Sequence, residues 1–132
     1  MMGDRANFAF KQTDTNTIVL YGHWAGYNML ANLAMAVDKA RGRWADESYA
    51  TRICISQLVG SEWNTETGWG MQVNSISDNE HKIPVINWGT QTFSLHEEAP
   101  HSFDSQIRGV NDEPIFTMSL DNFVKKYSPA LV

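Results

Sequence analysis

The alternation of hydrophobic and polar positions near the start of the chain predicts a β-hairpin. Phe8 and Phe10 alternate with their neighbours over residues 6–11, which is the period of two that a half-buried strand produces. Residues 18–21 are apolar at every position, which is typical of a strand in the middle of a sheet. Residues 12–16 between these two runs are polar and predict the turn.

This hairpin brings chemically distinctive side chains to one corner. With the turn centred near Asp14, pairing outward places Arg5 opposite or next to His23 and Trp24. The longest helix is expected to follow directly, so its unpaired N–H groups lie at the same corner. A permanent cation, an imidazole and an indole therefore gather beside a helix N-terminus.

Residues 26–41 have apolar positions at helical spacing and predict that helix. Its central part carries no charge. A helix that covers one face of a small sheet normally keeps a polar outer face. We therefore expect Met29, Met35 and Ala36 to form a second contact surface, which predicts a homo-oligomer.

A second helix and three further strands are expected in the middle of the chain. Asp46 can cap a helix that ends near residue 59, because a short polar side chain accepts a hydrogen bond from the free N–H groups of the first turn. After a polar loop, residues 69–76, 83–88 and 91–96 have strand character and turn-rich links, which predicts a three-stranded meander.

The chain changes character near its end. Residues 1–98 are expected to form the core domain, and residues 99–132 an extension with a short strand and a final helix capped by Ser119. Its apolar side chains must pack on its own sheet or on a neighbouring subunit, and the sequence does not choose. The expected fold is therefore a two-layer α+β domain, with an antiparallel sheet of about five strands covered on one face by two helices.

Composition narrows the classes of function. The chain has 132 residues, enough for one domain, and a net charge of −5, which argues against a protein that binds nucleic acid through bulk electrostatics. The single Cys54 cannot form an intramolecular disulfide. With no signal peptide and no apolar run long enough for a bilayer, the expected location is the cytoplasm.

The corner formed by the hairpin is the first candidate for a ligand site. In the functional interpretation, Arg5 pairs with a phosphate, Trp24 or Tyr27 stacks on a base, and His23 and Asn28 donate or accept hydrogen bonds. In the structural interpretation, Arg5 and His23 bond backbone carbonyl groups while Trp24 fills the core. The sequence leaves both open.

Other candidate residues carry weaker signals. Arg52 and Arg108 are second-rank cations for the same anion, and Trp63, Trp69 and Trp88 could serve the core, an interface or ligand stacking. The histidines lack the spacing of metal ligands, and no nucleophile lies in a catalytic motif. We therefore expect no metal, no cofactor and no catalytic residue.

The opening of the chain also carries a resemblance. Residues 2–6, Met-Gly-Asp-Arg-Ala, and residues 20–26, Leu-Tyr-Gly-His-Trp-Ala-Gly, resemble small, largely uncharacterised proteins of phages, prophages and their hosts. Those proteins open Met-Gly-Asn-Arg-Ala and carry a Tyr-x-His-Trp-x-Gly stretch, so Asp4 departs from the usual Asn. The resemblance implies a phage or prophage origin and an accessory role, such as binding and neutralising a host factor or a nucleotide signal.

Together these observations predict a non-enzymatic, oligomeric protein that binds a small anionic ligand, such as a nucleotide, in a phage counter-defence context. The competing hypothesis is a protein–protein interaction module that masks a host protein with its apolar helix face. A small hydrolase that acts on a nucleotide is the third.

Overall fold

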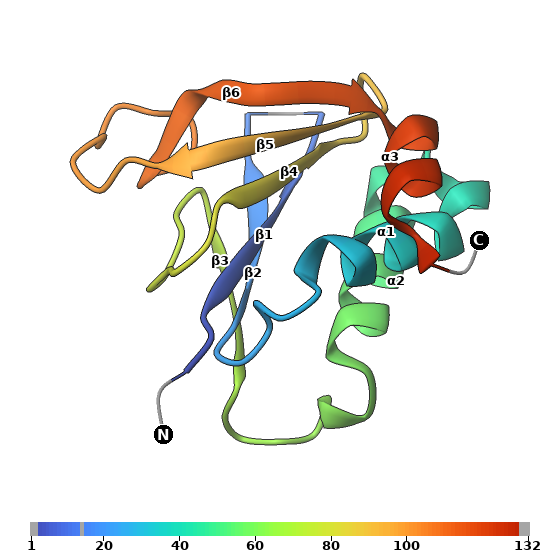
Figure 1. Ribbon diagram of the computed structural model, residues 1–132, viewed down its shortest axis with the longest axis horizontal. Coiled ribbons are helices and arrows are strands. Elements are labelled where there is room, and N and C mark those ends of the chain that lie inside the picture. The colour runs from blue at the N-terminus through green and yellow to red at the C-terminus, as the bar shows by residue number, and fades with distance from the viewer. Residues whose placement is uncertain (1–2, 14, 130–132) are drawn as a thin grey trace.

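The strands and helices of the protein form one sheet with a helix layer on one side (Figure 1). The computed structural model describes residues 3–13 and 15–129. Its elements are β1 (Ala6–Lys11), β2 (Thr17–Gly22), α1 (Met29–Lys39), α2 (Glu47–Val59), β3 (Trp69–Val73), β4 (Ile83–Asn87), β5 (Thr92–Glu98), β6 (Val110–Ser119) and α3 (Leu120–Tyr127). The predicted α+β class is confirmed, and within the described residues the sheet has six strands.

The order of the strands, β3-β2-β1-β4-β5-β6, corrects two details of the expected sheet. Neighbouring strands run antiparallel except β1 and β4, which pair in parallel, with Ala9 opposite Val85. The expected meander of three strands does not form, because β3 pairs with β2 instead of with β4. β3 is therefore one edge of the sheet and β6 is the other.

Residues 74–82 cause this difference, because they cross one face of the sheet instead of turning back in a hairpin. Asn7 of β1 anchors the crossing with a side chain that is fully buried. Its amide nitrogen donates to the Asp78 carbonyl (3.0 Å) and to Asn79 Oδ1 (3.1 Å). Its amide oxygen accepts from the Ser77 N–H (3.1 Å). The turn-rich composition of the segment gave no sign that a buried amide would hold it.

The two faces of the sheet carry separate clusters of buried side chains. On the helix face, Phe8 and Phe10 of β1 belong to the larger cluster, together with side chains of the helices. On the opposite face, here named the crossing face, Ala9 packs with Val19, Ile107 and other apolar side chains. β1 is thus buried on both sides, as expected of a central strand.

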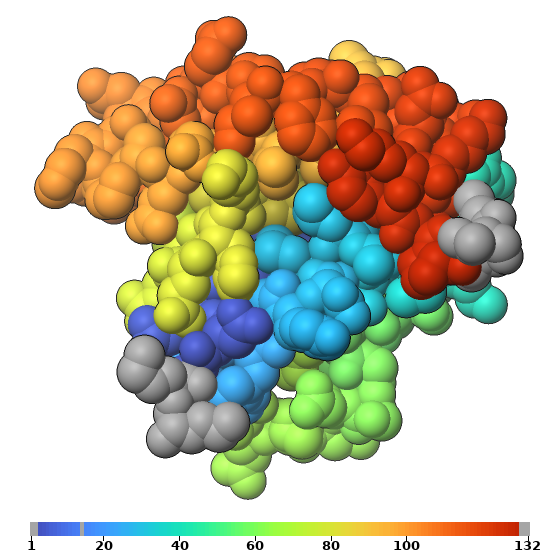
Figure 2. Space-filling model, viewed as in Figure 1, coloured from blue at the N-terminus to red at the C-terminus, as the bar shows by residue number. Residues whose placement is uncertain are grey.

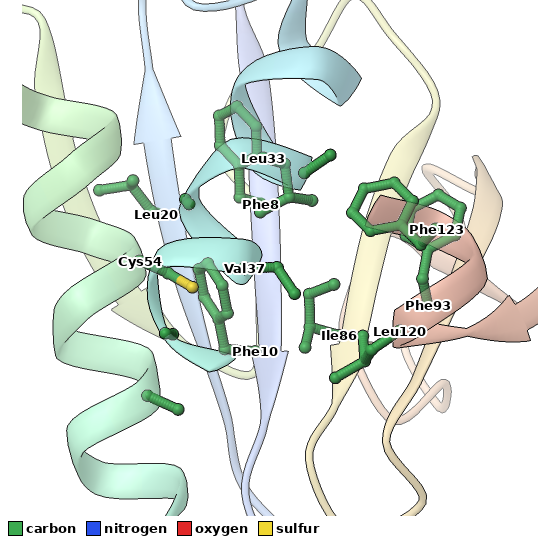
Figure 3. Packing of buried hydrophobic residues seen from close by; sticks show 14 of the residues in the cluster. Phe8, Phe10, Leu20, Leu33, Val37, Cys54, Ile86, Phe93, Leu120 and Phe123 are labelled. Atoms are coloured by element: carbon green, nitrogen blue, oxygen red, sulfur yellow. The ribbon is translucent and has the colours of Figure 1, made fainter. Parts of the chain in front are cut away.

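The position of α1 explains why its middle carries no charge. α1 packs against α2 on one side and α3 on the other, and Leu33 and Val37 point to Phe8 and Phe10 of the sheet (Figure 3). Met29 and Ala36 are buried in this cluster, while Met35 is 38% exposed. The expected second contact surface on α1 is therefore wrong for Met29 and Ala36, because α3 takes the place given to a partner.

Local capping signals locate two helix starts well and one poorly. Asp46 caps α2 by accepting from the Tyr49 N–H (3.5 Å), and Ser119 caps α3 by accepting from the Asn122 N–H (3.1 Å). The first helix begins at Met29 instead of residue 26. Asn28 before it is left-handed, with φ of 55°, and its side chain makes no capping bond.

The C-terminal segment packs on its own sheet and helices. β6 pairs with β5, and Phe123 of α3 stacks on Phe93 with ring centroids 4.0 Å apart (Figure 3). Arg41 also bonds Asp121 at the start of α3 (3.0 Å). Residues 130–132 and Asp14, the expected centre of the first turn, lie outside the described residues. The turn is nevertheless closed by a bond from the Gln12 N–H to the residue 16 carbonyl (3.0 Å).

The three ambiguous tryptophans have different environments. Trp88 belongs to the core, where its indole donates to Thr51 Oγ1 (2.9 Å). Trp69 is half-buried and donates to Glu62 Oε1 (2.9 Å), whereas Trp63 is 58% exposed. Among the described residues, no helix combines the length and the apolar character that crossing a membrane requires.

We predict that Phe123→Ala lowers the free energy of unfolding by about 3–5 kcal/mol, because it removes a buried ring stacked on Phe93. Chemical denaturation measures the change, and Lys126→Ala on the same helix is the control, since Lys126 is exposed. An equally small effect of both substitutions would contradict the packing of α3 on this core.

Candidate functional site

The hairpin register places the predicted corner residues next to one another along the backbone. Ala6 lies opposite Gly22, and the Asp4 N–H donates to the His23 carbonyl (2.8 Å), so Arg5 lies between two backbone contacts with β2. The predicted closeness of Arg5 and His23 is therefore found. The directions of their side chains, however, follow from the alternation of side chains between the two faces of the strands.

Arg5 belongs to the crossing face of the sheet. Ala6 and Phe8 face the helices, so Arg5, like Asn7, has the opposite orientation. Its N–H donates to Glu80 Oε1 (2.8 Å), and its side-chain Nε lies 4.0 Å from the same oxygen. That Nε is buried and has no hydrogen-bond partner among the described residues. A buried donor without a partner costs free energy unless a ligand or water satisfies it.

His23 lies near Arg5 on this face but is held by aromatic neighbours. The hydroxyl of Tyr21 lies 2.7 Å from His23 Nδ1, and the His23 ring meets Trp24 edge-on at 4.7 Å. Burial raises the pKa of the Tyr21 phenol; the positive charge of Arg5 opposes this rise, while nearby carboxylates add to it.

The start of α1 does not meet the Arg5 guanidinium, which corrects the expected geometry of the corner. The Gly26 N–H, expected to point at an anion, donates instead to the Asp4 carbonyl (2.9 Å). Tyr27 is 79% exposed, and Asn28 is also exposed. Trp24 is exposed over Gly68, where a Cβ atom would lie 3.0 Å from the indole. Neither Trp24 nor Tyr27 belongs to the lining of the cavity that Arg5 lines.

A contact that the sequence did not single out fills the space between Arg5 and α1. The Asp4 carboxylate bonds His81 Nε2, and Gly26 packs directly against this pair. With the backbone bonds of Asp4 to His23 and Gly26, this Asp4 clamp ties the start of β1 to the β2–α1 turn and to the crossing segment. In Figure 2 the dark blue start of the chain lies against the yellow crossing segment.

Arg108 reaches the same region from the C-terminal part of the chain. Its N–H donates to the Asn74 carbonyl (2.8 Å), and its carbonyl accepts from the Ile76 N–H (3.2 Å), so the crossing segment holds its backbone. Its guanidinium lies over the ring of Phe103, 5.2 Å from the centroid. Arg52, by contrast, is exposed on α2 and bonds Ser56 on the same helix (3.4 Å).

Arg5 and Arg108 line one cavity of about 490 Å³ on the crossing face, here named the Arg5–Arg108 cavity. Its other charged side chains are the carboxylates of Asp78 and Glu98. Ser75, Ser77 and Asn79 add polar groups to the lining, and Phe103 adds an aromatic ring; the remaining lining residues are Ile76, Pro100 and Gly109. The cavity therefore combines two cations with two carboxylates and a ring that is 63% exposed.

A larger cavity, of about 690 Å³, lies between the start of α1, residues 79–82 of the crossing segment and the strand β5. Its lining includes the carboxylates of Glu80, Glu97 and Glu98, with Lys82 bound to Glu97 at 3.6 Å. Three carboxylates repel an anion. The helix N-terminus therefore opens on a negatively charged region, which disfavours the anion site first expected there.

Candidate catalytic groups are held in ways that limit their chemistry. Burial raises the pKa of the Cys54 thiol to about 12, so the thiolate is scarce at neutral pH. His96 Nδ1 bonds the Asn111 carbonyl (2.7 Å), and its Nε2 bonds Ser94 Oγ (2.9 Å). The small cavity beside this pair is lined by His96 but not by Ser94. Within the described ranges, no three His, Cys, Asp or Glu side chains cluster as metal ligands do.

Comparisons with protein-family models, with curated proteins and with solved structures find no match for this chain. The resemblance of the opening residues to phage proteins therefore stays a prediction. The structure assigns Asp4 and Gly26 of that stretch to the Asp4 clamp, and Met2 lies outside the described residues.

The sequence contains one signal that places Arg5 correctly. Arg5 is an odd number of residues away from Phe8 and from Phe10, and side chains alternate between the two faces of a strand. The sequence therefore places Arg5 on the face opposite to these two rings. The roles of Phe103 and Asp78 have no comparable signal, because they depend on the path of irregular segments.

We predict that Gly26→Ala destabilises the protein by about 1–3 kcal/mol, because the added Cβ would overlap His81 Nε2 and force the Asp4 clamp apart. Thermal and chemical unfolding measure this loss. Gly42→Ala is the matched control, since a Cβ at Gly42 meets nothing within 4 Å. Equal stability of the two variants would show that the clamp is not needed.

We predict that His96 makes the protein less stable as the pH falls. Burial lowers the pKa of His96 below its usual 6.5, so the unfolded chain takes up this proton before the native state does. The penalty begins as the pH falls through the unfolded value and is complete below the native value. Denaturation with urea at about pH 7.5 and about pH 5.5, on either side of the ordinary histidine value, measures it.

His96→Gln should flatten this part of the pH dependence. His101→Gln serves as the control because His101 is exposed, and it should retain the decline of the wild-type protein. The prediction fails if His96→Gln and the wild-type protein lose stability in parallel between the two pH values.

Proposed function

We propose that this protein is a non-enzymatic binding protein that captures a small anionic ligand, such as a nucleotide, in the Arg5–Arg108 cavity. In the wider proposal, it is a phage accessory protein of the counter-defence type that acts in the cytoplasm of the host. The geometry of the cavity supports the capture of an anionic ligand, and the resemblance of the opening residues supports the phage accessory role.

One observation carries the proposal. Arg5 and Arg108, which lie far apart in the sequence, line the same cavity, and the Nε atom of Arg5 is buried without a hydrogen-bond partner among the described residues. Bonds from a guanidinium to a phosphate are charge-assisted and are among the strong hydrogen bonds of proteins. An anion between the two arginines would satisfy the orphaned donor and offset the repulsion of two like charges.

The rest of the lining favours a nucleotide over a bare anion. Asp78 and Glu98 balance the two cations, so the cavity does not attract every anion through net charge. Carboxylates accept hydrogen bonds, as ribose hydroxyl and base amino groups can supply. Phe103 is exposed and already lies beneath Arg108, so a base could stack on it.

The same balance argues against long nucleic acids. A polyanion needs a continuous basic surface, whereas this chain has a net charge of −5 and the cavity pairs its cations with carboxylates. The buried thiol of Cys54 offers no nucleophile for turnover.

We predict that a nucleotide ligand raises the melting temperature of the wild-type protein, since a ligand at a hundred times its Kd adds about 2.7 kcal/mol. Arg5→Ala and Arg108→Ala should each weaken binding about tenfold or more, the cost of one charge-assisted hydrogen bond. A thermal-shift screen with mononucleotides, cyclic nucleotides and inorganic phosphate makes the measurement, and isothermal titration gives Kd.

Arg52→Ala is the matched control, because it removes the same group from an exposed site outside the cavity. Its binding should equal that of the wild-type protein, and all three variants must melt normally without ligand. The proposal is wrong if no nucleotide or phosphate shifts the wild-type protein, or if Arg52→Ala weakens binding as much as the cavity variants.

A further inference from the structure

One edge of the sheet is open and apolar. In the part of the chain that the structure describes, β3 pairs only with β2, so its outer side has no strand beside it. Met71 and Val73 of this strand are each 59% exposed. Unpaired N–H and C=O groups on an edge strand can bind another strand, and exposed apolar side chains make that pairing favourable.

The other edge of the sheet carries the features that normally prevent such pairing. The outer strand β6 contains Asp112, Glu113 and Pro114 in succession, and its register with β5 is shifted at His96. Charges, proline and irregular register protect an edge from another chain. β3 has none of these, and residues 67–77 around it contain no charged side chain. The contrast indicates that the β3 edge is a contact surface.

A shallow groove accompanies β3 on the helix face. It has a volume of about 180 Å³, and its apolar lining consists of Leu20, Val59, Trp63, Trp69 and Met71. The one carboxylate in the lining, Glu62, accepts a hydrogen bond from the Trp69 indole (2.9 Å). Trp69 and Met71 belong to β3 and also line the groove. A second strand paired with β3 would therefore place its own side chains at the mouth of the groove.

We propose that β3 pairs antiparallel with β3 of a second copy of this chain, about a two-fold axis at Met71. This register sets Met71 against the partner's Met71 and Trp69 against the partner's Val73. The apolar positions 69, 71 and 73 are symmetric about the axis, so the strand is complementary to itself. The partner's Val73 then lies beside Trp69 and completes the open side of the groove.

Charge favours a second copy as the occupant. A two-fold contact brings groups near the axis close to their own copies, so any charge there would meet its like. For a chain with a net charge of −5, the uncharged strand β3, residues 69–73, offers a surface on which two copies can meet without repulsion. The Arg5–Arg108 cavity lies on the crossing face, whereas the groove lies on the helix face. The proposed pairing of two β3 strands therefore does not cover the proposed ligand site.

The test is the mass of the protein in solution, measured by light scattering and by sedimentation. The wild-type protein is expected at twice the mass of one chain, and Met71→Lys at the mass of one chain, because two lysines would meet at the axis. Met35→Lys is the matched control: Met35 is the partly exposed methionine of α1, and its substitution should leave the dimer intact. Circular dichroism and melting verify that both variants fold.

A cross-link tests the register itself. Directly opposed residues of antiparallel strands have Cα atoms about 4.5–5.5 Å apart, which suits a disulfide. Met71→Cys should therefore form a covalent dimer on mild oxidation, whereas Ile115→Cys on the β6 edge should not; Cys54 is buried and stays unreactive. A wild-type protein that remains monomeric at its highest soluble concentration overturns the proposal. A dimer that Met71→Lys leaves intact, or that Met35→Lys dissociates, overturns it equally.

Discussion

The parallel pairing of β1 with β4 is the constraint on which the rest of this structure depends. An antiparallel hairpin needs only a short turn, but two parallel strands require the chain to travel back across the sheet before it pairs. Residues 74–82 make part of that journey over the crossing face. Asn7 holds them there with three hydrogen bonds from a fully buried side chain. A polar group in the central strand is acceptable because each of its atoms has a partner.

The crossing segment also creates the candidate site. Because it runs over β1, it brings Glu80 to Arg5 and His81 to Asp4, and its backbone receives Arg108 from the C-terminal part of the chain. No element of regular structure positions both arginines. The cavity exists because irregular segments lie on a rigid sheet, an arrangement that is common for binding sites. The Arg5–Arg108 cavity and the cavity at the start of α1 are lined by different cations and apolar groups, although Asn79 and Glu98 line both.

Sequence patterns predicted the local structure well and the long-range pairing poorly. The hairpin, the helix caps at Asp46 and Ser119 and the α+β class follow from rules that act over a few residues. The parallel pair and the position of β3 at an edge do not, because strand order is decided by packing between distant segments. The charge-free middle of α1 shows the same limit: the pattern indicated that this helix is covered on more than one side, but it could not show that α3 of the same chain covers it. For Arg5, the alternation of side chains along β1 relative to Phe8 was enough to predict the face of the sheet on which it lies.

The burial of α1 changes where self-association should be sought. With α3 packed on one side of α1 and α2 on the other, Met35 and Tyr49 are the large hydrophobic side chains that the described helices expose. Two exposed apolar side chains of the sheet, Met71 and Val73, instead belong to β3, and the exposed Trp63 lines the same groove as Met71. The unpaired backbone groups of an uncharged edge strand can pair with strands of other protein molecules. Proteins normally prevent such pairing, as Pro114 does on β6. A specific partner for β3 removes that hazard, and a second copy of the chain is always present at the concentration of the protein itself.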